Sequence, residues 1–137
     1  MPAIVDTSAL VALVQSRDPW HAAVAAAIAA ERGSLTVPLT VVVEAAQLIG
    51  RRLGVAAESA WLRALIAGPW AIEPSTVPDL ERAAQLIDQY READIGLVDA
   101  TVMAMAERLG SVRLYTLDRR DFGIIRPRHV ASLELLP

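Results

Sequence analysis

The stretch AIVDTSALVALV, residues 3–14, joins a short β-branched segment to an apolar helical segment through a single acidic residue. Residues 3–5 predict a short strand, and residues 7–14 predict the helix that follows it. Asp6 stands between the two, at the point where a strand of an α/β sheet would end. A short apolar strand followed by a helix is the pattern that the rest of the chain repeats.

Further strands are expected at residues 35–37, 70–72 and 112–116, with a short fifth at 124–125. Helices are expected at 21–32, 40–53, 55–67, 78–90 and 97–109. Short strands that are apolar throughout and separated by helices predict a parallel sheet covered on both faces. We therefore expect one α/β domain over residues 1–137, a three-layer sandwich with a mostly parallel sheet of four to five strands.

Several helix ends carry local signals. Asp18 and Pro19 are a favourable cap and first turn for the second helix, and Gly33 is expected to end it. Thr40 is expected to cap the third helix, and Gly110 to end the helix over 97–109. The residues after Pro127 predict no element.

Composition excludes several kinds of site. The 137 residues include no cysteine and only two histidines, so disulfides, thiol catalysis and structural zinc are not expected. The longest stretch without a charge, residues 19–30, is far too short to span a membrane. No basic segment precedes the N-terminal apolar residues, so we expect no signal peptide and a cytoplasmic location.

The balance of charge and hydrophobicity bears on partners. The net charge of −3 argues against nucleic-acid binding through overall charge, although a local patch of arginines remains compatible with it. Hydrophobic residues make up 54% of the chain, which suggests that a partner covers some of its surface.

Familiar catalytic motifs are missing. The seven glycines form no Gly-x-Gly, so neither a dinucleotide fingerprint nor a phosphate-binding loop is present. Ser8 or Ser16 could form a hydrolase triad with His21 and an aspartate, but no Gly-x-Ser-x-Gly motif supports this interpretation. The six aromatic residues show no spacing suited to stacking on bases.

Four carboxylates fall where a parallel sheet would gather them. Asp6 and Asp118 follow the first and fourth predicted strands, and Glu44 and Asp99 lie in the first turns of two helices. Ligands of an open parallel sheet bind beyond the carboxyl ends of its strands. We therefore expect these four side chains to converge.

Each acid also has an ordinary structural interpretation. Asp6 would cap the first helix, and Asp99 would stabilise a helix N-terminus. Glu44 would lie on a solvated helix face, and Asp118 would belong to a turn. Each interpretation is sufficient for its own residue. Together they do not readily explain why four acids would lie at one edge of a sheet.

Converging carboxylates repel one another unless a cation lies among them. Oxygen ligands without Cys or His select Mg²⁺ or Mn²⁺, and such ions support phosphodiester hydrolysis. The hydroxyls of Ser8 and Thr116 are candidates for orienting a carboxylate or a water. The candidate contacts to a nucleic-acid backbone are Arg51, Arg52, Arg119 and Arg120.

Three segments resemble motifs of PIN-domain nucleases. Residues 4–10, IVDTSAL, resemble the opening motif of that family, and residues 97–110 resemble its third motif. Residues 115–122, YTLDRRDF, resemble the fourth motif in the form found in VapC-type toxins of bacterial toxin–antitoxin pairs. The order and spacing of the motifs agree over essentially the whole chain.

The resemblance implies a PIN-like fold and a metal-dependent endoribonuclease that uses a metal-activated water to cleave a stable RNA, tRNA or rRNA. Asp6, Glu44, Asp99 and Asp118 match the acidic quartet that holds Mg²⁺ or Mn²⁺ and carries catalysis, Glu44 mainly by its position in the chain. Asp121 would share or replace the role of Asp118. Asp94 would lie near the site without being a ligand.

The resemblance also implies partners. Toxins of this family are inactivated by a cognate VapB-type antitoxin, whose C-terminal segment occupies a groove leading to the site. We expect that groove near the helices of residues 7–32 and the helix of residues 40–53. We also expect a homodimer without membrane contact. Two alternatives remain open: a PIN nuclease of RNA maturation, and a non-catalytic binding module that holds no metal. A small antitoxin reading frame directly upstream would favour the toxin.

Overall fold

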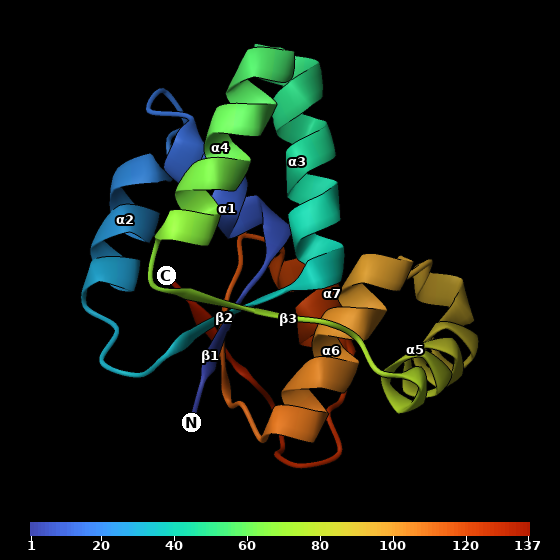
Figure 1. The fold of residues 1–137 in the computed structure, drawn as a ribbon. Coiled ribbons are helices and arrows are strands. Elements are labelled where there is room, and N and C mark those ends of the chain that lie inside the picture. Colours follow the sequence, from blue (N-terminus) through green and yellow to red (C-terminus); the bar gives the residue numbers. More distant parts are fainter.

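The computed structural model describes residues 1–137 as a five-stranded sheet with helices packed on it (Figure 1). The strands are β1 (Ala3–Val5), β2 (Leu35–Pro38), β3 (Trp70–Glu73), β4 (Arg113–Tyr115) and β5 (Glu134–Leu136). The helices are α1 (Thr7–Val14), α2 (His21–Ala29), α3 (Leu39–Leu53), α4 (Val55–Ala67), α5 (Val77–Gln89), α6 (Leu97–Leu109) and α7 (Arg119–Ile124), with a 3₁₀ turn at Arg91–Ala93.

The strand order is β3-β2-β1-β4-β5, and every neighbouring pair is parallel. Ala3 lies opposite Leu35 of β2, and Val5 lies opposite Tyr115 of β4. The chain builds outward from β1 to β3 and then returns through α5 and α6 to β4, on the other side of β1. The order therefore reverses between β1 and β4, which is where an open parallel sheet leaves a crevice at its carboxyl edge.

The first strand lies at the centre of the core. Ile4 and Val5 are completely buried, as their uninterrupted apolar run predicts for a strand covered on both faces. In Figure 1, α1 to α4 gather on one side of the sheet and α5 to α7 on the other, which confirms the predicted α/β sandwich. None of the helices is both long enough and apolar enough to cross a membrane.

Local signals explain two of the helix ends. Thr76 and Asp79 form a reciprocal capping box at the start of α5, and Pro78 occupies its first turn. Gly110 ends α6 in the left-handed conformation, with φ of 65°, which glycine adopts without steric cost. The helix predicted over 97–109 is confirmed with these bounds.

The predicted fifth strand at 124–125 is wrong. Residues 119–124 form α7, because the Asp118 side chain accepts a hydrogen bond from the backbone N–H of Asp121 and caps a helical turn there. The fifth strand is β5, which extends the sheet beside β4, and the N–H of Thr116 donates to the carbonyl of Leu136 at 2.8 Å. Three residues carry too little periodicity to predict a strand that pairing creates.

Two predicted helix caps are also wrong. The second helix begins at His21 and ends at Ala29, and the Asp18 carboxylate accepts from the N–H of Trp20 in the preceding turn. The third helix begins at Leu39 because β2 runs directly into it, so Thr40 lies inside the helix. Its hydroxyl instead bonds to that of Thr101 on α6 at 2.8 Å.

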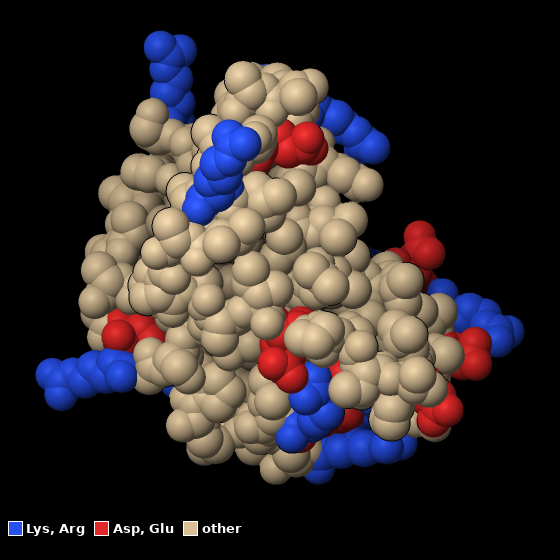
Figure 2. All heavy atoms as spheres, viewed as in Figure 1, with Lys and Arg blue, Asp and Glu red and all other residues tan.

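Much of the surface over the sheet carries no charge. Figure 2 shows a broad uncharged area on the face where α4, β3 and α5 lie in Figure 1. Ile66 on α4 and Val77 on α5 are 66% and 68% exposed. These side chains account for part of the high apolar content of the chain.

We expect Ile4→Ala to lower the free energy of unfolding by about 2–5 kcal/mol, because it leaves a cavity in a core that cannot collapse around it. Ile66→Ala is the matched control, since Ile66 is 66% exposed, and should change it by less than about 0.5 kcal/mol. Urea denaturation followed by circular dichroism measures both. Equal losses would contradict the central position of β1.

Candidate active site

A hollow of about 410 Å³ opens beyond the carboxyl ends of β1 and β4, at the reversal of strand order. We call it the acid pocket. Its lining includes all four predicted acids, drawn from four separate segments of the chain. The lining residues are Asp6, Thr7, Ser8, Val11, Asp18, Glu44, Leu48, Arg52, Asp99, Leu117 and Asp118.

Asp6 is only 3% exposed, although it is a carboxylate. It precedes α1 in the cap position, yet its side chain makes no capping hydrogen bond. Its Oδ2 accepts from the hydroxyl of Thr116 at 2.8 Å and from that of Ser8 at 3.4 Å, whereas Oδ1 is buried without a protein partner. The helix-cap interpretation of Asp6 is therefore wrong, and one of its oxygens remains free for a ligand.

Two hydroxyls tie the segment after β4 to the start of α1. Ser8 and Thr116 lie 3.2 Å apart, Oγ to Oγ1. The backbone N–H of Leu117 donates to Ser8 at 2.9 Å, and that of Asp118 donates to Thr116 at 3.0 Å. Ser8 and Thr116 thus hold Asp6 and Asp118 in a fixed relation, and the bond between Thr116 and Asp6 spans 110 residues of sequence.

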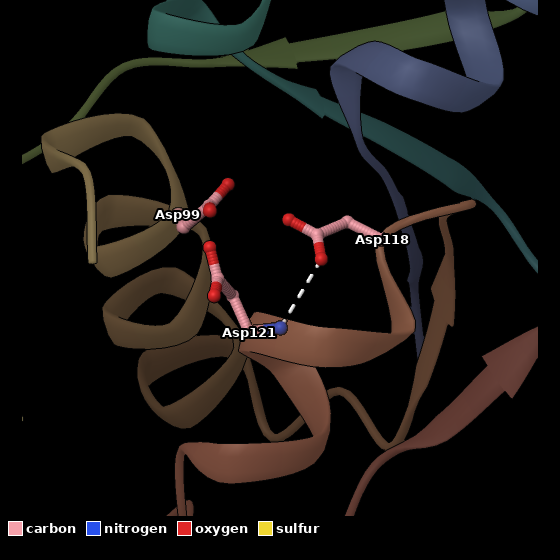
Figure 3. Close-up of side chains that lie close together, drawn as sticks. All are labelled: Asp99, Asp118 and Asp121. Carbon is pink, nitrogen blue, oxygen red and sulfur yellow. Dashed lines mark hydrogen bonds between the residues drawn. The ribbon is translucent and has the colours of Figure 1, made fainter. Parts of the chain in front are cut away.

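Asp99, Asp118 and Asp121 point toward one another in Figure 3. Each offers one carboxylate oxygen, and these three oxygens lie within 4.8 Å of one another. Asp99 comes from the first turn of α6, Asp118 from the loop after β4, and Asp121 from α7. The N–H of Asp121 donates to Asp118 Oδ1 at 3.1 Å. The turn interpretation of Asp118 is therefore correct, and its carboxylate nevertheless faces the acid pocket.

Burial and mutual repulsion strongly perturb two of the acids. Burial raises the pKa of Asp6 from 3.8 to about 6, a rise to which the charges of Glu44 and Asp118 add. Burial also raises the pKa of Asp99 to about 8, together with the charge of Asp6 and a hydrogen bond with Asp121. A cation among these acids would lower both pKa values, because it favours the ionised form of each carboxylate.

The structure separates the remaining predicted residues. Arg52 lines the acid pocket, whereas Arg51 lines a different hollow beside Glu58. The Arg119 guanidinium donates to the carbonyl of Pro137, and the Arg120 guanidinium pairs with Asp121 at 2.6 Å. Neither of these two arginines lines the acid pocket.

Asp94 does not line the acid pocket. It is exposed, with φ of 55°, at the end of the 3₁₀ turn. Its position near the carboxylates, without being a ligand, stays a prediction.

Two polar residues of the acid pocket were not predicted as site residues. Asp18, interpreted as a helix cap, lines the pocket from the loop between α1 and α2. Thr7 lines it with a buried hydroxyl that has no protein partner. The position of Thr7 next to Asp6 was the available signal, whereas nothing in the local sequence marks Asp18.

Comparisons with known proteins show the family of the chain. Residues 3–126 match the family model of the PIN domain. Ribonuclease VapC26 of Mycobacterium tuberculosis (strain ATCC 25618 / H37Rv) is 39% identical over 134 residues, which cover 98% of this chain and 99% of that protein.

Solved structures share the fold. VapC20 of Mycobacterium tuberculosis, a toxin that cleaves the sarcin–ricin loop, matches 86% of this chain and 91% of its own with a TM-score of 0.80 and 24% identity. VapBC2 of Rickettsia felis, bound to a DNA fragment from its promoter, matches 100% of both chains with a TM-score of 0.74 and 14% identity. With its acids at the reversal of a parallel sheet and a full-length VapC relative, the chain belongs to the PIN domain family, in its VapC-type branch.

Proposed function

We propose that this protein is a divalent-metal-dependent endoribonuclease, the toxin of a toxin–antitoxin pair, and that it cleaves a stable RNA. One observation carries the proposal: four acids from distant segments line a single pocket, and Asp6 Oδ1 is buried there without a protein partner. The full-length likeness to a VapC ribonuclease supports it.

The donor set fits a hard cation. The acid pocket offers carboxylate and hydroxyl oxygens without any cysteine or histidine, which favours Mg²⁺ or Mn²⁺. Asp6, Glu44, Asp99 and Asp118 would hold the ion, and Asp121 lies against the last two. Such an ion, when bound, lowers the pKa of water and offsets negative charge on a phosphate.

The side chains around these acids orient them. The Thr116 hydroxyl donates to Oδ2 of Asp6 at 2.8 Å, which leaves Oδ1 as the oxygen that is free to bind the ion. The N–H of Asp121 holds one oxygen of Asp118 and leaves the other toward the pocket. Fixing a carboxylate through its second oxygen determines the direction of the first, as outer hydrogen bonds do in metal sites.

The substrate and the protein partner follow from the relatives. VapC20 cleaves the sarcin–ricin loop. For this chain we propose a stable RNA, either rRNA or tRNA. The Rickettsia felis relative was solved with its antitoxin, and another neighbour is a toxin–antitoxin complex from Klebsiella pneumoniae. The uncharged face over α4, β3 and α5 is suited to contact with an antitoxin or a second copy of the chain.

We expect induced expression of the wild-type protein in a permissive bacterium to arrest growth and to produce discrete fragments of tRNA or rRNA. Asp99→Asn should lower the cleavage rate of the purified protein by at least about 100-fold, because the site loses a charged ligand. EDTA should abolish wild-type cleavage, and Mg²⁺ or Mn²⁺ should restore it.

The exposed Asp88 supplies the matched control, since Asp88→Asn changes the same charge on α5, outside the acid pocket. Undiminished cleavage by Asp99→Asn would contradict the catalytic assignment. Growth arrest by both proteins without RNA fragments would favour a non-catalytic binding module.

We expect Thr116→Val to weaken Mn²⁺ binding, measured by isothermal titration calorimetry, by about 10- to 100-fold. The substitution removes the hydroxyl that holds Asp6 Oδ2, so the carboxylate loses its fixed orientation. Thr40→Val removes a hydroxyl that bonds to Thr101 and lies outside the acid pocket, so it should leave the affinity unchanged. Equal affinities for all three proteins would exclude a positioning role for Thr116.

The stability of the metal-free protein should depend on pH through the same acids. Their pKa values in the folded protein, about 6 for Asp6 and about 8 for Asp99, lie above 3.8, the ordinary value. The folded state therefore binds more protons than the unfolded state over this range, so stability falls as the pH rises from about 4 to about 8.

Replacing Asp99 with Asn removes one of these ionisations. At about pH 8 the metal-free Asp99→Asn protein should be more stable than the wild type by about 1 kcal/mol or more, and the difference should shrink toward pH 4. Thermal unfolding across this range measures it, with Asp88→Asn as the control. A pH-independent difference would show that repulsion among the carboxylates is not its cause.

A further inference from the structure

The acid pocket by itself repels the substrate that we propose for it. Its lining carries five carboxylates and a single basic residue, Arg52. RNA carries one negative charge per nucleotide. An ion held among the acids would offset the charge of the cleaved phosphate only. The net charge of −3 supplies no general attraction either. Phosphates beside the cleaved one therefore need cationic side chains at the margin of the pocket.

A second hollow, of about 430 Å³, adjoins the acid pocket. We call it the loop pocket. It lies between the end of α1, the loop that follows α1, and the end of α3, which are all found at the upper end of the molecule in Figure 1. Asp18 lines both hollows, so they are neighbours. The residues that line the loop pocket are Val14, Gln15, Ser16, Arg17, Asp18 and Leu53.

Each of the two hollows has one arginine in its lining. Arg52 lines the acid pocket and donates to Gln15 Oε1 of the loop pocket at 3.4 Å, and Arg17 lines the loop pocket itself. Both are exposed, and neither pairs with a carboxylate, whereas Arg82 and Arg108 are held in ion pairs. A guanidinium that is not held in an ion pair retains donors for a phosphate.

The loop pocket combines the surfaces that a nucleotide requires. Val14 and Leu53 offer apolar contact to the face of a base, and Gln15 and Ser16 offer hydrogen bonds to its edge. The carboxylate of Asp18 already accepts from the N–H of Trp20 at 2.8 Å, which fixes the loop that bounds the pocket.

We propose that the loop pocket is a subsite for the RNA strand, in which Arg17 and Arg52 bind phosphates that flank the cleaved one. The inference rests on the proposed ribonuclease function and extends it to substrate binding. The two hollows share Asp18, so a strand with its cleaved phosphate in the acid pocket would bring neighbouring phosphates to the two arginines. This arrangement favours RNA over an acidic peptide.

Binding is tested separately from catalysis. In the Asp99→Asn background, fluorescence anisotropy follows a short, end-labelled, single-stranded RNA of mixed sequence over a series of salt concentrations. Arg17→Gln and Arg52→Gln should each weaken binding by about 10-fold. Each should also reduce the slope of log affinity against log salt by about 0.7, the value for one phosphate contact on a single strand.

Arg32→Gln is the matched control. Arg32 is exposed, unpaired and located before β2, at the amino edge of the sheet opposite the acid pocket, so both the affinity and the slope should stay unchanged. Thermal unfolding of each variant checks the fold, which should be unaffected because Arg17 and Arg52 are exposed.

In the catalytically intact protein, the two substitutions should raise KM for RNA and leave Mn²⁺ affinity unchanged. Wild-type affinity and slope in both variants would overturn the subsite, and so would an Asp99→Asn protein that does not bind the RNA at low salt. A labelled acidic peptide that loses binding in the variants, while the RNA does not, would make the loop pocket a peptide site and also overturn it.

The two proposals can fail independently. If the wild type does not cleave RNA with Mg²⁺ or Mn²⁺ while the arginine variants lose RNA binding as expected, the nuclease function fails and the subsite stands. If cleavage requires Asp99 while the arginine variants bind RNA normally, the subsite fails and the nuclease function stands.

Discussion

The structure depends on a carboxylate that folding forces into the interior. Asp6 ends the central strand, whose residues are completely buried, so the Asp6 side chain is buried with them. Burial of an ionised carboxylate is costly unless hydrogen bonds or a cation compensate for it. The hydroxyls of Ser8 and Thr116 satisfy one oxygen and leave the other without a partner. The fold therefore retains a position that a cation, rather than the protein, would satisfy.

The same constraint organises the surroundings of the acid pocket. The order of strands reverses between β1 and β4, so Asp6 and Asp118 approach each other from the two strands that flank the crevice. Asp118 serves two purposes: one oxygen caps α7, and its carboxylate still takes part in the cluster with Asp99 and Asp121. A structural role and a proposed functional role thus belong to one side chain, which is why neither interpretation of Asp118 excluded the other.

The errors in the predicted elements share a physical cause. Asp18 and Thr40 are good capping residues, but capping competes with other hydrogen bonds, and in the folded chain Asp18 bonds to a turn and Thr40 to Thr101 of another helix. The strand β5 is three residues long and exists because β4 offers it a free edge. Local propensity is weak compared with tertiary contacts, so short elements and helix ends are the parts that it predicts least well.

The sequence by itself determined the alternation of strands and helices, and with it the parallel sheet and the edge at which four acids would meet. These features are local, because the periodicity of apolar residues and the position of an acid after a strand can be read within about ten residues. Only the tertiary structure decided that Asp18 and Arg52 line the acid pocket, and that Arg17 lines the neighbouring hollow. The reason is that these relations depend on how loops and helix ends pack across the molecule, and no spacing along the chain encodes that distance.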